Sequence, residues 1–217
     1  MKVVGVLLAG GQSRRMGGGD KALRLLGGVT LLDRVVARLR PQVATLVLNA
    51  NGDPARFAGF GLPVVADGVP DFAGPLAGVL AGLDWAAEHA RDCRYVASVA
   101  TDTPFFPPDL VARLVRGLVE AGADLACAAS GGRPHPVFGL WPVRLKEELR
   151  HAVVADGIRK VDLFTARHKL VTVPFDARPA DPFFPADPFF PADPFFNVNR
   201  PEDFAAAAAL AAASGTA

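Results

Sequence analysis

Short apolar runs alternate with longer amphipathic stretches through the first 130 residues. The apolar runs predict strands, and the longer stretches, with apolar positions at helical spacing, predict helices. Strands that alternate with helices are typical of βαβ units and of a mostly parallel sheet. The expected strands are residues 3–9, 44–48, 62–66, 95–100 and 124–129, and the expected helices are residues 30–40, 75–89 and 107–121.

The pattern changes beyond residue 130, although 217 residues in all suit one domain. We expect a strand with alternating polar and apolar residues, then two helices, a further strand, and a last helix that ends near residue 213. The second of the two helices carries Arg159 and Lys160. In chain order these elements are residues 135–141, 144–154, 157–167, 169–175 and 201–213.

A six-residue repeat stands before the last helix. Ala-Asp-Pro-Phe-Phe-Pro begins at Ala180 and again at Ala186, and a partial third copy runs from Ala192 into Asn197. Each proline removes a backbone donor and disfavours helix, so we expect the tract to be extended or loop-like. We interpret it as an inserted loop without a catalytic role, whose six phenylalanines either pack on the surface or form an adhesive patch.

Polar or glycine residues follow the expected strands at their carboxyl ends. Gly10-Gly11 follows the first strand, Asn49 the second, Asp67 the third and Asp102 the fourth. Parallel strands end at one edge of their sheet, and ligands bind outside that edge. The sequence therefore predicts that these positions meet there.

The loop after the first strand combines glycine with positive charge. Glycines let the backbone approach a ligand closely, and their N–H groups can cradle phosphate oxygens. Arg14, Arg15 and Lys21 add three cations, which suits a polyphosphate, although a solvated basic loop is the alternative. The spacing fits neither the Walker loop, which ends in Gly-Lys-Ser/Thr, nor the dinucleotide fingerprint.

Composition and charge exclude several classes of protein. A net charge of +1 gives no case for a nucleic-acid surface, and no apolar run reaches the ~18–20 residues of a membrane span. An export signal would place its apolar core after Arg14-Arg15, whereas here the apolar run comes first. Cys93 and Cys127 form no C-x-x-C, so neither a zinc site nor a disulfide framework is expected. We expect a cytoplasmic protein without nucleic-acid or membrane partners.

The segment from Leu7 to Leu23, LLAGGQSRRMGGGDKAL, resembles the signature LAGG-x-S-x-R-M-G-x-x-K of nucleotidyltransferases. It is most similar to the molybdenum cofactor guanylyltransferases, which are MobA-like nucleotidyltransferases. Related cytidylyltransferases carry LAAG, so Gly10 contributes to the distinction. The resemblance implies a Rossmann-like, three-layer α/β fold with a mostly parallel central sheet. Further matches are Asn49, Asp67, Gly74-Pro-Leu-Ala-Gly78, Asp102-Thr-Pro, His135-Pro-Val and Asn197-Val-Asn199, and only the repeat departs from the pattern.

The resemblance also assigns residues to a single domain, 1–217, with a nucleotide-binding half (1–130) and an acceptor-binding half (131–217) that holds the repeat insertion near 180–196. It implies catalytic roles for Arg15, Lys21 and Asp102, the last as the ligand of Mg²⁺. The implied GTP-binding residues are Leu8, Ala9, Gly10, Gly11, Lys21, Asn49, Asp67 and Asp102, and the implied acceptor-binding residues are His135, Arg159, Lys160, Asn197 and Asn199.

The residue types fit these roles, but structural alternatives stay open. Magnesium takes one or two carboxylates plus phosphate oxygens and water, so Asp102 can suffice, yet it can also cap a turn. A carboxylate at Asp67 can accept from N1–H and N2–H₂ of guanine, or form an Asp-Gly turn. Asn49 can donate to guanine O6 or to ribose. His135 either contacts the second substrate or packs in its strand. For Arg159 and Lys160 the alternative is a solvated helix face.

The reaction implied by the resemblance is transfer of GMP from GTP to the terminal phosphate of molybdenum-bound molybdopterin, with release of pyrophosphate. A histidine base would be superfluous, because a phosphomonoester with a second pKa of about 6 is already anionic near neutrality. The implied partners are GTP, molybdopterin and, transiently, proteins that make or receive the cofactor. Two alternatives remain: a related enzyme for cytidylyl transfer to the pterin or for a sugar-phosphate acceptor, and a non-catalytic GTP-binding module.

Overall fold

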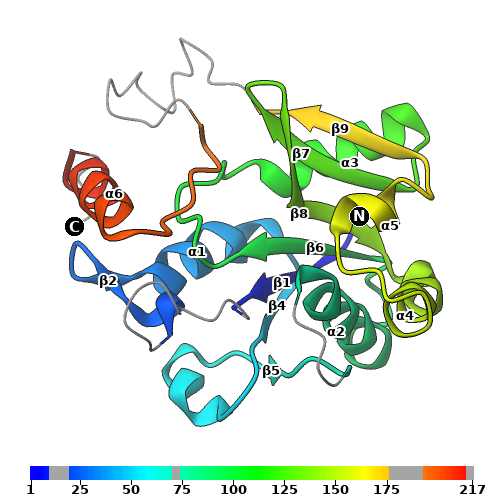
Figure 1. Cartoon of the computed structure of the whole chain (residues 1–217), viewed down its shortest axis with the longest axis horizontal. Coiled ribbons are helices and arrows are strands. Elements are labelled where there is room, and N and C mark those ends of the chain that lie inside the picture. The colour runs from blue at the N-terminus through cyan, green and yellow to red at the C-terminus, as the bar shows by residue number, and fades with distance from the viewer. Residues whose placement is uncertain (10–19, 70–73, 176–192, 214–217) are drawn as a thin grey trace.

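A seven-stranded sheet forms the centre of the molecule (Figure 1), for which a computed structural model describes residues 1–9, 20–69, 74–175 and 193–213. The strand order is β5-β4-β1-β6-β8-β7-β9. Only β8 runs antiparallel to its neighbours, β6 and β7, which confirms the mostly parallel sheet. The strands are β1 (Val3–Leu8), β4 (Thr45–Asn49), β5 (Val64–Val65), β6 (Tyr95–Ala100), β7 (Leu125–Ser130), β8 (Arg133–Pro142) and β9 (Leu170–Pro174).

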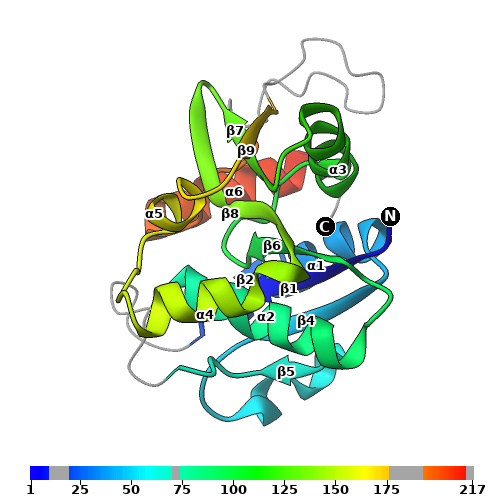
Figure 2. The ribbon, with the colours of Figure 1, turned by 90° about the vertical axis from the view of Figure 1, so that its right-hand side faces the viewer.

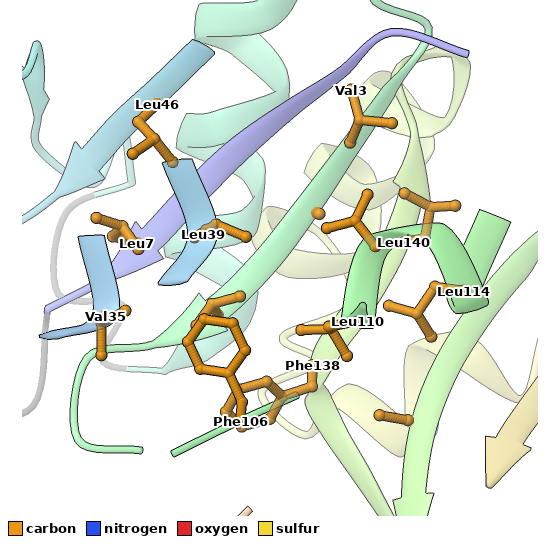
Figure 3. Packing of buried hydrophobic residues seen from close by; sticks show 14 of the residues in the cluster. Val3, Leu7, Val35, Leu39, Leu46, Phe106, Leu110, Leu114, Phe138 and Leu140 are labelled. Carbon is orange, nitrogen blue, oxygen red and sulfur yellow. The ribbon is translucent and has the colours of Figure 1, made fainter. Parts of the chain in front are cut away.

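Helices cover both faces of this sheet and make three layers, as expected. Helices α1 (Leu31–Leu39) and α3 (Leu110–Ala121) pack on one face, where Phe106 and Phe138 join their leucines in the core (Figure 3). On the other face lie α2 (Pro75–His89), α4 (Lys146–Val154) and α5 (Val161–Thr165), with α2 and α4 side by side (Figure 2). Because the central strands are buried on both faces, they are apolar almost throughout.

Smaller elements complete the described parts. A hairpin of β2 (Leu25–Leu26) and β3 (Val29–Thr30) leads into α1, whose first turn is capped by the Thr30 hydroxyl, 3.0 Å from the Asp33 backbone nitrogen. Helix α6 (Pro201–Ala213, red in Figure 1) lies beside β2. The 3₁₀ turns are η2 (Lys21–Leu23), η3 (Arg40–Gln42), η4 (Pro54–Phe60) and η5 (Val143–Leu145). No helix in these parts has the length and hydrophobicity of a membrane span.

The predicted strand at residues 135–141 is longer than expected, and it runs antiparallel to the two strands beside it. Gly131 and Gly132, with φ of 53° and 73°, form a two-residue turn that glycine favours, so β7 and β8 are a hairpin. The expected alternation is wrong for its second half, since every residue of 138–142 is buried. The reason is the central place of β8, which has neighbours on both sides and helices on both faces.

The predicted helix over residues 157–167 is wrong in its extent. Helix α5 begins at Val161, so Arg159 and Lys160 precede it rather than lying on its face. Gly157 has a left-handed φ of 66°, and Lys160 is extended with φ of −87° and ψ of 132°. These backbone angles prevent a helix from continuing through the segment.

The third copy of the repeat corrects the interpretation of the tract. Phe195 is only 2% exposed and packs against Phe138 and Phe175, and Phe196 is partly buried in a cluster with Leu26. A surface position is therefore wrong for Phe195. The first two copies, residues 180–191, lie outside the described residues.

We expect deletion of residues 180–191, which joins Pro179 to Ala192, to leave the protein folded. The deletion keeps the third copy with its core contacts, and loop-closure free energy changes by only about 0.6 kcal/mol per doubling of loop length. The free energy of unfolding, measured by urea denaturation, should hold or rise. Phe195→Ala is the contrasting variant, for which we expect a loss of about 3–5 kcal/mol. An unfolded deletion variant would contradict the inserted-loop interpretation.

Candidate active site

The carboxyl ends of β1, β4, β5 and β6 lie together at one edge of the sheet. In the strand register Leu8 stands between Asn49 and Ala100, and Asn49 stands beside Val65. The Ala9 backbone N–H continues the ladder with a 2.9 Å hydrogen bond to the Asn49 carbonyl. Asn49, Asp67 and Asp102 therefore share one edge, as the topology predicts, whereas Gly10, Gly11 and Arg15 lie outside the described residues.

A cluster of three polar side chains forms where β6 ends. The Lys21 ammonium is 2.7 Å from Asp102 Oδ2 and also donates to Asn199 Oδ1. The side chains of Lys21 and Asp102 are 14% and 27% exposed, so this ion pair is largely shielded from solvent. The structure thus brings together two predicted catalytic residues and one predicted acceptor residue that are far apart in sequence.

Two threonines hold Asp102 in place, and sequence reasoning did not select them. The hydroxyl and the backbone nitrogen of Thr101 lie 3.2 and 3.3 Å from the Leu8 carbonyl oxygen, which ties β6 to β1. Thr103 is fully buried and its hydroxyl contacts Asn197 Oδ1. The Asp102 carbonyl accepts from the Val198 backbone N–H at 2.9 Å. The Asn-Val-Asn segment is therefore attached to the Asp102 backbone directly and to the neighbouring side chains of Thr103 and Lys21.

A second cluster lies at the ends of β4 and β5. Asp67 Oδ1 accepts from the Asn49 amide at 2.9 Å, and Asp67 Oδ2 accepts from the Asn51 amide at 2.7 Å. The Asp67 backbone N–H in turn donates to Asn51 Oδ1 at 2.9 Å. Both carboxylate oxygens are thereby fixed in direction. Asn51 was missed as a site residue, although its i+2 spacing from Asn49 is a signal that could have found it.

Helix α2 passes directly behind Asn49, and a glycine makes this approach feasible. A Cβ atom on Gly78 would lie 2.3 Å from Asn49 Oδ1 and 2.7 Å from Leu8 Cδ2, closer than packed atoms approach. Asn49 itself is only 3% exposed. The lack of a side chain at Gly78 thus leaves the space in which the Asn49 amide lies.

His135 packs inside a polar and aromatic cluster. Its Nε2 is 2.6 Å from Ser130 Oγ, and the Ser130 hydroxyl donates to Asp193 Oδ1 at 2.6 Å. Its ring stacks obliquely on Phe195, with centroids 4.5 Å apart. Burial lowers the pKa of His135, and the Asp193 carboxylate opposes this only in part, which favours the neutral imidazole. Because the hydroxyl donates to Asp193, it is not activated by the imidazole as a nucleophile.

Arg159 and Lys160 are exposed in the loop before α5. The Arg159 carbonyl oxygen lies 3.5 Å from where a Cβ on Gly74 would be, which places this loop beside the start of α2. The described contact of this loop is with the start of α2. Asn197 and Asn199, in contrast, flank Val198 next to Asp102.

The site holds few groups that could bind a metal. Within the described ranges no three His, Cys, Asp or Glu side chains gather as a ligand set. Asp102 brings one carboxylate, with the amide oxygens of Asn197 and Asn199 close by. Such oxygen donors suit a hard cation that takes its remaining ligands from phosphate and water.

Several sequence relatives of this chain share one name. A protein from Bradyrhizobium sp. (strain ORS 278) named molybdenum cofactor guanylyltransferase is 59% identical over 210 residues, which cover 97% of this chain and 93% of that protein. A protein of the same name from Nitrobacter hamburgensis is 56% identical over 211 residues, covering 97% and 95%.

Solved structures agree with the fold. The molybdopterin-guanine dinucleotide biosynthesis protein A from Archaeoglobus fulgidus superimposes with a TM-score of 0.70 at 24% identity, covering 98% of this chain and 99% of that one. A 2-C-methyl-D-erythritol 4-phosphate cytidylyltransferase from Thermus thermophilus gives 0.65 at 20% identity, covering 98% and 100%. At these identities the likeness shows the shared nucleotidyltransferase fold alone.

The family model confirms the resemblance found in the sequence. Residues 5–170, from β1 to the start of β9, match the model of the MobA-like NTP transferase domain. The matched span includes Lys21, Asn49, Asp67 and Asp102 at the sheet edge. The chain therefore belongs to the family of MobA-like NTP transferases.

Proposed function

We propose that this chain transfers GMP from GTP to the terminal phosphate of molybdenum-bound molybdopterin, forming the guanine dinucleotide form of the cofactor and pyrophosphate. The names of its relatives support this reaction. The observation that carries it is the arrangement at the sheet edge, where the Lys21–Asp102 pair lies at the end of β6 and the Asn49–Asp67 pair lies at the ends of β4 and β5, on the other side of β1. The Lys21–Asp102 pair suits a triphosphate, and the Asn49–Asp67 pair suits a base.

In this reaction an oxygen of the acceptor phosphate forms a bond to the α-phosphorus of GTP. The bond from that phosphorus to the bridging oxygen breaks, and pyrophosphate leaves with the electron pair. The protein's task is to position the two phosphates in line and to stabilise the developing charge. No side chain needs to take a proton from the acceptor, which is already anionic near neutrality. The neutral, packed state of His135 fits that requirement.

Lys21 supplies the mobile charge in this proposal. Its ammonium is a compact cation on a flexible stem, so it can turn from Asp102 to a phosphate oxygen. Asp102 would hold Mg²⁺, with phosphate oxygens and water as the other ligands. When bound, the ion neutralises charge on the triphosphate. Arg15 and the backbone N–H groups of the loop at Gly10 and Gly11 stay predictions for the same task.

Asp67 is proposed to recognise guanine. Each carboxylate oxygen can accept two hydrogen bonds, and one place on each is used by Asn49 or Asn51. The places that remain suit the adjacent N1–H and N2–H₂ donors of guanine. Asn49, which already donates to Asp67, positions that carboxylate in addition to any contact with O6 or ribose.

The acceptor half, residues 131–217, is proposed to bind the pterin through His135, Arg159, Lys160, Asn197 and Asn199. Asn199 has the most direct support, because its amide contacts Lys21 at the point where the two substrates must meet. Transient contact with proteins that make or receive the cofactor follows from the family's place in cofactor synthesis. A reaction that consumes GTP belongs in a compartment that supplies it, so we place the protein in the cytoplasm.

The test is an acceptor-dependent assay of pyrophosphate release with each of the four nucleoside triphosphates and Mg²⁺. We expect release with GTP only when molybdenum-bound molybdopterin is present. A preference for CTP, or release with a sugar phosphate as acceptor, would indicate the related nucleotidyltransferases instead. GTP binding without release under any of these conditions would indicate a non-catalytic module.

A further inference from the structure

Arg56 joins two parts of the candidate site, although none of the motifs in the sequence includes it. It lies in η4, the 3₁₀ segment that follows β4. Its Nε is 2.9 Å from Asp20 Oδ2, and its Nη2 donates to the backbone carbonyl of Asn51. The guanidinium thus connects the residue before Lys21 with the residue that holds Asp67.

The side chain of Arg56 is fixed by its surroundings. Its guanidinium carbon lies 4.8 Å from the ring centroid of Phe57, which is 1% exposed and anchors η4 in the core. A Cβ on Gly52 would lie 3.3 Å from Arg56 Nη1, so the backbone closes over the guanidinium. The side chains of Arg56 and Asp20 are 33% and 24% exposed. A planar guanidinium presents its donors in a rigid fork, so it can hold these two acceptors in one fixed geometry that a compact ammonium on a flexible stem does not reproduce.

One arm of this connection leads to the phosphate end of the site. The Asp20 carbonyl accepts from the Leu23 backbone N–H at 3.1 Å and so starts the η2 turn that contains Lys21. With the Asp20 carboxylate bound to Arg56, the start of this turn has a fixed position relative to η4. That position lets the Lys21 ammonium reach Asp102.

The other arm leads to the base end. Arg56 holds the Asn51 carbonyl, and the Asn51 side chain makes two hydrogen bonds to Asp67, at 2.7 and 2.9 Å. Movement of Asn51 would therefore turn the Asp67 carboxylate. The two arms meet in a single guanidinium, which contacts both Asp20 and Asn51.

We infer that Arg56 is a positioning residue that holds the phosphate end and the base end of the nucleotide site at a fixed separation. The inference rests on the proposed function, because it takes Lys21 as a phosphate contact and Asp67 as a base contact. A ligand that spans two subsites gains the full benefit of both only when their separation matches its own length. Arg56 would thus strengthen the binding of intact GTP more than the binding of guanosine or of tripolyphosphate alone.

The experiment compares GTP with its two parts in the full chain carrying Arg56→Gln. Binding of labelled GTP is measured directly, and guanosine and inorganic tripolyphosphate are measured as competitors. We expect GTP affinity to fall roughly tenfold, because the two ends are no longer aligned, while the affinity of each part changes less than about threefold. The melting temperature is recorded for each variant.

Three further variants sharpen the comparison. Asp20→Asn should weaken GTP as Arg56→Gln does, and the double variant should be no worse than either single one, because both remove the same connection. Arg56→Lys should restore only part of the affinity, since a compact ammonium on a flexible stem does not reproduce the rigid fork of the guanidinium. Arg167→Gln breaks a similar exposed pair, 2.7 Å from Asp156, away from the sheet edge, and should leave GTP binding unchanged.

Several results would overturn the inference. Unchanged GTP affinity in both Arg56→Gln and Asp20→Asn would show that the connection positions nothing. An equal loss for GTP and tripolyphosphate would show that Arg56 contacts phosphate directly. A failure of the proposed GTP site looks different, because wild-type protein would then bind neither GTP nor these competitors at one site, and a failure of the proposed reaction alone would leave GTP binding in place. If Arg56→Gln does not fold, Asp20→Asn and Arg56→Lys still give the comparison.

Discussion

We expect replacement of Asp102 by alanine to abolish magnesium-dependent turnover and to leave the fold intact. The side chain is only partly buried and lies at the sheet edge, so its removal takes away a charge and a proposed metal ligand rather than core volume. Loss of a single group that stabilises transition-state charge typically costs on the order of 10²- to 10³-fold in rate. We expect at least that loss in pyrophosphate release, with an unchanged circular dichroism spectrum and melting temperature.

Two variants make this result specific. Asp102→Asn keeps an acceptor for Lys21 and removes only the charge, so we expect it to be inactive as well. Asp92→Ala breaks another lysine–carboxylate pair, with Lys2 at 2.6 Å, at the opposite end of β1, and should stay active. Near-normal turnover of Asp102→Ala at saturating Mg²⁺ would disprove the metal-binding role.

Asp67→Asn should weaken GTP much more than it weakens CTP. The substitution puts an N–H₂ group where both an Asn amide and the guanine donors need an acceptor. An unpaired donor in a partly buried site costs about 1–3 kcal/mol, or roughly 5- to 150-fold in affinity. Cytosine does not present the same pair of donors, so the loss for CTP should be smaller. Direct binding measurements with both nucleotides give the ratio.

Asp53→Asn is the matched control for base recognition. This carboxylate accepts from the Ala55 backbone N–H at 2.9 Å and caps η4 close to the site, but it does not contact Asp67. Its replacement should leave the ratio of GTP to CTP affinity unchanged. Equal losses of GTP and CTP in Asp67→Asn would show that Asp67 serves phosphate, metal or fold rather than the base.

Residues that depend on topology could be predicted from the sequence. Asn49, Asp67 and Asp102 meet because each follows a parallel strand, and the carboxyl ends of parallel strands lie at one edge. The order of strands and helices in residues 1–130 could also be predicted, because it follows from the period of the hydrophobic pattern. These features need only the period of the pattern and the direction of the chain.

Residues that depend on lateral side-chain contacts could not be predicted in this way. Nothing local to Arg56 indicates that it reaches Asp20, and Ser130 meets His135 only because a hairpin returns β8 beside β7. The reversal of β8 itself follows from a two-glycine turn whose φ values periodicity does not report. Phe195 looked like a surface residue because its repeat is rich in proline, yet one copy is part of the core.

The contact between Lys21 and Asn199 has a consequence for the order in which the protein is made. The two residues are 178 positions apart, so the amide is added long after the lysine. At synthesis rates of about 5–20 residues per second, the interval is roughly 9 to 36 s. During that time the nascent chain can form the strand edge around Asp102 without the segment that contacts it. The complete candidate site therefore forms only after the segment that carries Asn199 has been synthesised.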